Sequence, residues 1–91
     1  MIGKSTLKVP GGKLLKAEVN YEGELIRSAK VCGDFFMHPE TAINDLEKAL
    51  CDIPVEDLEN NVNRFFQVNS VTLFGVDAGD FVKVVRLALE S

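Results

Sequence analysis

Residues 31–40 read VCGDFFMHPE, and this stretch decides the fold of the chain. An alternating, β-branched run stops at Gly33, two phenylalanines follow, and the pattern becomes helical after Pro39. The sequence therefore predicts a strand that turns abruptly through an aromatic corner into a helix. Gly33 is predicted to end the strand in a tight turn that a β-carbon would obstruct. The short side chain of Asp34 is predicted to bond backbone N–H groups of that turn.

Upstream of the corner the sequence predicts three strands, over residues 5–9, 15–21 and 25–32. Residues 15–21 alternate most clearly, with apolar side chains facing one way and Lys, Glu and Asn the other, which is typical of a half-buried antiparallel strand. Residues 10–13 and 22–24 contain glycine and are predicted to form the two connecting turns.

The third strand contains one misfit. Its alternation places Leu25, Ala29 and Val31 inward, and Arg27 shares their parity. Near the end of a strand, Arg27 could lay its aliphatic stem on apolar surface and keep its charge in water.

Downstream of the corner the hydrophobic period becomes helical. Pro39 suits the first helical position, where its missing N–H costs nothing, and Glu40 complements the positive end of the helix dipole. The first helix is predicted to end near Cys51, because Pro54 blocks its continuation.

Two more helices are predicted, over residues 55–68 and from about residue 78 or 80 to residue 89, the last capped by Asp77 or Asp80. Residues 71–76 contain Gly75 and are either extended or a buried turn. The expected inward residues of the three helices are Ile43, Leu46, Ala49 and Leu50, then Leu58, Val62, Phe65 and Phe66, and finally Phe81, Val84, Val85 and Ala88.

These elements predict an α+β fold: a three-stranded antiparallel β-meander followed by two to three helices packed on one face. We expect a single domain over residues 1–91, since typical domains run to about 100–150 residues. A domain this short hides about 60–65% of its unfolded surface and is therefore expected to be marginally stable alone.

Composition excludes several classes of function. The net charge of -4 argues against non-specific nucleic-acid binding, because a phosphate backbone requires a basic face. No apolar run approaches the roughly 20 residues that cross a bilayer, and no hydrophobic signal region opens the chain. We therefore expect a cytoplasmic protein that binds neither membranes nor nucleic acid.

No residue pattern predicts a metal or phosphate site. One His and two distant Cys cannot supply a closed zinc site. Residues 3–5 (GKS) and 11–13 (GGK) lack the full phosphate-loop pattern between a strand and a helix, so a ragged terminus and a hairpin turn are the better interpretations. We expect no catalytic residue, bound cofactor or metal on this chain.

Three possible reactive or docking features each have a simpler structural interpretation. His38 is favoured as a polar residue just before the first helix, and Cys32 as a buried, inert thiol. Of the adjacent Phe35 and Phe36, one is predicted to anchor the domain and the other to face a partner, unless the helices wrap the corner completely. The carboxylates Glu56, Asp57 and Glu59 are expected to form an ordinary solvated first turn.

The segments GGKLLKAEV (residues 11–19) and GDFFMHPE (residues 33–40) resemble the C-terminal accessory domain of lipoate–protein ligases. In some organisms, notably archaea, that domain is a separate small polypeptide. The resemblance covers most of the chain and is most specific over residues 11–40.

The resemblance implies an accessory subunit in a heterodimer with a separate catalytic subunit. That subunit would hold ATP, Mg and lipoate, form lipoyl-adenylate and pass the lipoyl group to a lysine of a carrier domain. Because this chain begins at Met1 without an upstream catalytic domain, we expect a two-component enzyme or a truncated gene product. The expected docking motif comprises Gly33, Asp34, Phe35, Phe36, His38 and Pro39.

Two other functions remain open from the sequence. One is a small sulfur-acceptor protein that uses the thiol of Cys32. The other is an interaction module unconnected with a ligase.

Overall fold

An antiparallel sheet in the strand order β1-β2-β3-β5 forms one layer of the computed structural model, which describes residues 1–11 and 13–90. Its strands are β1 (Ile2–Lys8), β2 (Leu14–Glu22), β3 (Leu25–Gly33) and the short β5 (Ile53–Pro54). The first three strands form the predicted meander, because the polar and apolar residues of each alternate with the two-residue period of a strand.

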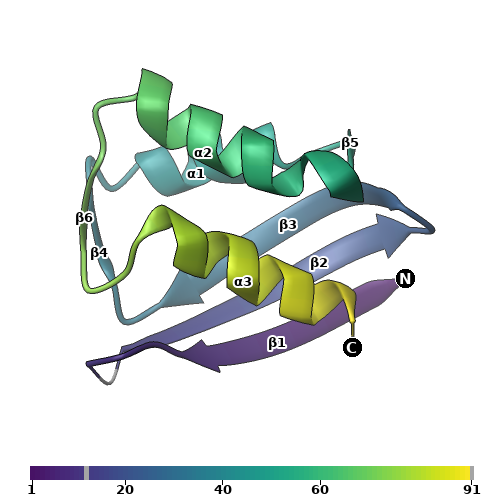
Figure 1. Ribbon diagram of the computed structural model, residues 1–91, viewed down its shortest axis with the longest axis horizontal. Coiled ribbons are helices and arrows are strands. Elements are labelled where there is room, and N and C mark those ends of the chain that lie inside the picture. The colour runs from purple at the N-terminus through teal and green to yellow at the C-terminus, as the bar shows by residue number, and fades with distance from the viewer. Residues whose placement is uncertain (12, 91) are drawn as a thin grey trace.

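Three helices cover one face of this sheet (Figure 1). They are α1 (Ala42–Ala49), α2 (Leu58–Val68), which the 3₁₀ turn η1 (Val55–Asp57) precedes, and α3 (Ala78–Leu89). Helix α3 packs on β1 and β2, α1 packs on β3, and α2 packs against the other two helices. The predicted α+β fold with helices on one face is confirmed.

The core lies between these two layers. The sheet contributes Leu15, Ala17, Val19, Ile26, Ala29 and Val31, and the helices contribute Leu46, Leu50, Leu58, Val62, Phe65, Phe81, Val84, Val85 and Ala88. Of the expected inward helix residues, Ile43, Ala49 and Phe66 are only partly buried against this core. In the described part of the chain no polar or charged residue is buried.

A two-stranded sheet at one end of the molecule was not predicted. Strand β4 (Phe36–His38) pairs antiparallel with β6 (Thr72–Phe74), with Phe36 opposite Phe74 and His38 opposite Thr72. The segment that the sequence left ambiguous is therefore extended. Figure 1 shows this pair at the end of the structure away from both chain termini.

The start of the first helix differs from the prediction. Helix α1 begins at Ala42, and Pro39 and Glu40 lie in a turn before it, where the Pro39 carbonyl accepts a bond from the Ala42 N–H at 3.0 Å. The peptide bond between His38 and Pro39 is cis. Pairing with β6 keeps Phe36–His38 extended, so the chain needs this turn before a helix can start. Pro39 is therefore not the first helical residue.

A bulge explains the misfit at Arg27. Asn20 pairs with Ser28 and Tyr21 pairs with Ile26, so Arg27 is an extra residue on β3. The alternation shifts by one at this point, which buries Ile26 and leaves Arg27 exposed. The predicted inward parity of Arg27 and Leu25 is wrong for this reason, whereas Ala29 and Val31 do face the core.

The remaining local predictions concern loops and caps. Asp77 caps α3: its side chain accepts a bond from the Asp80 N–H at 3.1 Å, and the Asp80 side chain accepts one from the Asp77 N–H at 3.0 Å. Gly3 pairs with Val19 inside β1, so the expected ragged terminus at residues 3–5 is wrong. Gly12 of the predicted hairpin turn lies outside the described residues; next to it, the Val9 N–H donates to the Lys13 carbonyl at 2.9 Å.

No helix in residues 1–11 or 13–90 is long and apolar enough to cross a membrane. The cytoplasmic location expected from the sequence stays a prediction.

The structure confirms that a β-carbon at position 33 would obstruct the end of β3. Its φ is 154°, and a β-carbon there would overlap the carbonyl oxygen of Leu14 and lie 3.0 Å from the Cα of Leu15. The next residue, Asp34, donates its backbone N–H to the same Leu14 carbonyl at 2.8 Å. The end of β3 is thus pressed against the start of β2.

Replacing Gly33 with alanine is expected to lower the free energy of unfolding by about 2–5 kcal/mol, because the added carbon overlaps backbone that cannot easily move. The matched control is Gly23→Ala, in the β2–β3 turn, where φ is 57° and the space for a β-carbon is open. It should cost only about 1–2 kcal/mol of backbone strain. Urea unfolding followed by far-UV circular dichroism measures both losses, and equal losses would contradict the close-contact argument.

Candidate functional site

The two phenylalanines of the corner have different environments. Phe35 is half-buried, and its ring meets Phe81 of α3 edge-to-face, with centroids 5.3 Å apart and planes at 85°. Phe81 is fully buried and also lies 5.7 Å from the ring of Phe66. Phe35 is therefore joined to the core through an aromatic cluster, an arrangement that stabilises beyond simple area burial.

Phe36 points away from the core and is 52% exposed. Its ring lies 5.9 Å from that of Phe74, which is 59% exposed and directly opposite on β6. Met37, the next residue of β4, is buried in the core. Adjacent residues of a strand point to opposite faces, so β4 divides its side chains between the core and solvent.

The sequence did not identify Phe74 as part of this site. The available signal was an apolar run that could be extended, in which Thr72 and Phe74 share one face. The sequence did not show which strand this run would pair with, because Phe74 and its partner Phe36 lie 38 positions apart in the chain.

A shallow depression of about 310 Å³ lies beside the exposed aromatic pair. Its lining comes from β3, the corner and α1 and includes Cys32, Phe35, Phe36 and Ile43. An exposed aromatic pair next to a partly apolar depression is the arrangement that protein interfaces use as an anchor.

The other residues of the predicted motif are at the surface. His38 is exposed and is the last residue of β4, so its predicted place directly before a helix is wrong. Asp34 and Pro39 are exposed as well. In the part of the chain that the structure describes, no group of three or more His, Cys, Asp or Glu residues could hold a metal ion.

Cys32 is exposed, so the expectation of a buried thiol is wrong. It lies opposite Lys16 on β2 and on the face of β3 that the helices do not cover. The parity of the strand carries this information, since the neighbouring Val31 faces the core. The second thiol, Cys51, is exposed too and donates to the Glu47 carbonyl at 3.4 Å.

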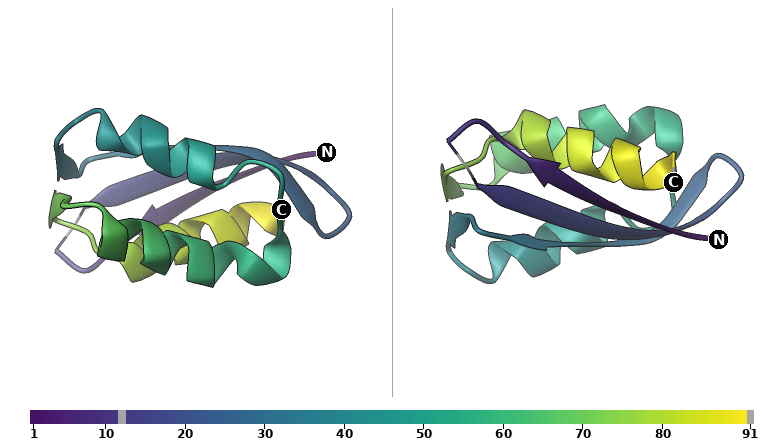
Figure 2. Two further views of the ribbon diagram at one scale, coloured as in Figure 1. Left: turned by 90° about the horizontal axis from the view of Figure 1, so that it is seen from above. Right: turned by 90° about the horizontal axis from the view of Figure 1, so that it is seen from below.

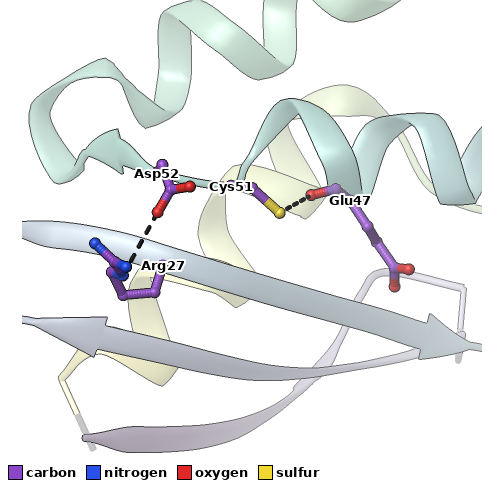
Figure 3. A network of polar contacts seen from close by, with 4 residues as sticks. All are labelled: Arg27, Glu47, Cys51 and Asp52. Carbon is purple, nitrogen blue, oxygen red and sulfur yellow. Dashed lines mark hydrogen bonds and ion pairs between the residues drawn. The ribbon is translucent and has the colours of Figure 1, made fainter.

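The polar contacts near these thiols join secondary-structure elements. In Figure 3, Arg27 approaches Asp52 with 3.5 Å between Nε and Oδ1, and the Glu47 side chain extends from α1 toward the sheet. The Glu47 carboxylate accepts the Val31 N–H at 2.9 Å. Because β5 pairs only with Leu25 and Ile26, this bond closes part of the open edge of β3.

The acidic first turn of α2 is largely solvated, as predicted. Glu56 and Glu59 are exposed, Asp57 is half-buried, and Glu59 pairs with Arg86 of α3 at 3.3 Å. Glu59 thereby connects α2 to α3 at the surface.

Both thiols are expected to react in the native state because both are exposed. Titration with a disulfide reagent should modify two thiols per chain before any denaturant is added. The Cys32→Ser and Cys51→Ser variants, each retaining one thiol, assign the two reactions. A thiol that reacts only after unfolding would contradict its placement at the surface.

No model of a protein family matches the sequence, whereas comparison with curated proteins and with solved structures finds similar chains. The curated protein "Lipoate-protein ligase A subunit 2" of Thermoplasma acidophilum is 31% identical over 74 residues, which are 81% of this chain and 78% of that protein. A solved chain has a TM-score of 0.86 and 29% identity, covering 94% of this chain and 96% of that one. It comes from an archaeal lipoylation system, a bi-partite lipoate protein ligase and its E2 lipoyl domain from T. acidophilum.

Proposed function

This chain belongs to the family of Lipoate-protein ligase A subunit 2, and we propose that it is the accessory subunit of a two-part lipoate–protein ligase. The resemblance over residues 11–40 is thereby confirmed and extends through the helical part. The observation that carries the proposal is the agreement of folds, with a TM-score of 0.86 over 94% of this chain and 96% of its relative.

In this proposal a separate catalytic subunit holds ATP, Mg and lipoate. The pair activates lipoate to lipoyl-adenylate, and the lipoyl group then passes to a lysine of a carrier domain. The arrangement of this chain supports that division, because residues 3–5, which most resemble a phosphate loop, lie within the β1–β2 ladder. Their backbone cannot converge on a phosphate as a loop before a helix does.

The accessory subunit acts as a cover and supplies no catalytic side chain. Lipoyl-adenylate is a mixed anhydride that water hydrolyses, so its formation benefits from exclusion of water and ordered loops. A mobile cover supplies both. The single domain of residues 1–91, with three helices on one face of a sheet, would form the rigid body of that cover.

The aromatic corner is the proposed docking site for the catalytic subunit. Gly33 and Asp34 fix the turn, Phe35 anchors the corner to α3, and Phe36 contacts the partner, with His38 and Pro39 at the rim. Phe74 joins this set, because its exposed ring lies against Phe36. Burial of this surface in a 1:1 heterodimer would raise the stability of a marginal domain by mass action.

The chain alone is expected to show no ATP–pyrophosphate exchange with lipoate, whereas the chain with its catalytic subunit should show it. The reason is that the sequence lacks the full phosphate-loop pattern, and residues 3–5, which most resemble it, lie in a strand. Exchange is measured for each subunit and for the equimolar mixture. Activity of the chain alone, or a catalytic subunit equally active without it, would refute the accessory role.

Variants at the corner should separate anchoring from docking. Phe35→Ala is expected to cost about 3 kcal/mol of stability, because it removes the ring that packs on Phe81. Phe36→Ala should leave the fold nearly intact, weaken the heterodimer by about 2 kcal/mol and slow adenylation. Transfer from preformed lipoyl-adenylate, measured with saturating acceptor domain, should be largely spared.

The matched control is Ile2→Ala, an apolar residue that is 61% exposed at the other end of the molecule. It should change neither stability nor heterodimer affinity. Thermal unfolding, titration calorimetry with the catalytic subunit and the two half-reactions provide the measurements. If Phe36→Ala unfolds the chain as Phe35→Ala does, the corner is only core and has no docking role.

A further inference from the structure

The charges of this acidic chain are unevenly distributed. Residues 1–33, which form the meander, carry six basic and three acidic side chains, and residues 34–91 carry four basic and eleven acidic ones. The net charge of -4 thus divides into +3 on the first segment and -7 on the second. The three α-helices carry four basic and four acidic side chains, so the sheet is the basic layer of the molecule and the acidic excess lies in the turns and loops outside these helices.

Three lysines gather on the face of the sheet that the helices leave open. The right-hand view of Figure 2 shows this face, with the helices behind the strands. In one row across the three strands, Glu18 on β2 lies between Lys4 on β1 and Lys30 on β3. In the next row that faces outward, Lys16 on β2 lies opposite Cys32 on β3. Lys4, Lys16 and Lys30 are all exposed, and we call them the lysine face.

The lysine face also has a recess. A depression of about 640 Å³ is lined by these three lysines, by the carboxylates Glu18 and Glu47, and by Cys32 and smaller side chains of the sheet. Side chains directly opposite on neighbouring strands lie about 4.5–5.5 Å apart at their β-carbons, so the charges are concentrated. Three positive and two negative side chains leave a local excess of one positive charge.

The chemistry of this face determines the kind of partner that fits. A permanent interface buries a large apolar area, which this face does not offer. Polar, charged surfaces instead use opposite charge to steer partners that bind and leave. Glu18 in the middle of the lysines disfavours a continuous polyanion and suits a protein surface that is mainly acidic.

Resting on the proposed function, we propose that the lysine face is the docking surface for the protein substrate of the ligase, an acidic carrier domain that presents the acceptor lysine. The aromatic corner, on the β4–β6 end, remains for the catalytic subunit (Figure 1). The two surfaces adjoin at Cys32, which lines both depressions, but the exposed rings lie on β4 and β6 and the lysines on β1, β2 and β3, so one accessory subunit has separate side chains for each protein. The carrier is then held near the activated acyl group by charge.

The test uses the complete complex of this chain with its catalytic subunit and an apo E2 lipoyl domain as the acceptor. The variant Lys4→Glu/Lys16→Glu/Lys30→Glu reverses the lysine face. The control variant Lys48→Glu/Arg64→Glu/Lys83→Glu reverses three exposed charges on the helices and changes the net charge equally. Heterodimer affinity, ATP–pyrophosphate exchange, and the kcat and KM for the acceptor domain are measured for each variant.

The lysine-face variant should raise the KM for the acceptor about tenfold, with exchange and heterodimer affinity changed less than twofold. The control should leave all of these quantities within about twofold. The KM of the unmodified complex should also rise between about 0.05 and 0.5 M salt, and that of the lysine-face variant should not.

Two results would overturn the proposal. An unchanged KM would show that the lysine face does not touch the acceptor, and loss of exchange or of the heterodimer would assign the face to the catalytic subunit. Either result leaves the accessory role intact if the unmodified complex still performs exchange. Failure of exchange in the unmodified complex would instead refute the proposed function, and the docking proposal with it.

Discussion

The arrangement of the site depends on the close contact between the backbone of Gly33 and the carbonyl group of Leu14. The missing β-carbon lets the end of β3 approach the start of β2, and the Asp34 N–H then bonds to the same carbonyl at 2.8 Å. This bond sets the direction in which the chain leaves the sheet. Phe35 consequently packs on Phe81 of α3, while Phe36 continues into β4 and faces solvent.

The pairing of β4 with β6 gives that corner a second support. Residues 36–38 are held by residues 72–74, which connect α2 to α3. The exposed rings of Phe36 and Phe74 are therefore presented by paired backbone and not by a free loop. A docking surface on paired strands loses less conformational entropy on binding than one on an unpaired segment.

Coverage of the sheet from one side gives the domain two unlike surfaces. The helices bury the apolar face of the meander, and their outward side chains are mostly polar, with as many acidic as basic ones. The uncovered face keeps the lysines of β1, β2 and β3 in water. In the proposed complex, the accessory subunit would act through these surfaces, by holding one protein at an aromatic edge and attracting another by charge.

The sequence by itself determined the features that depend on neighbouring residues. Alternation predicted the meander, helical spacing predicted the faces of α2 and α3, Asp77 or Asp80 was identified as a cap, and Gly33 was identified as a position without room for a β-carbon. Each of these follows from local sterics or from a period of two or 3.6 residues. The division between Phe35 and Phe36 was likewise predicted, because adjacent side chains cannot share one core.

Only the tertiary structure decided the rest. The β4–β6 pair joins segments that are more than thirty residues apart in the chain. Hydrogen bonds between such distant strands leave no signal in the sequence of either segment alone. This pairing places the start of α1 after Pro39 and brings Phe74 to the site. The bulge at Arg27 arises from the register between β2 and β3. Exposure of Cys32 depends on which face of the sheet the helices cover, and that choice is made by the packing of the whole chain.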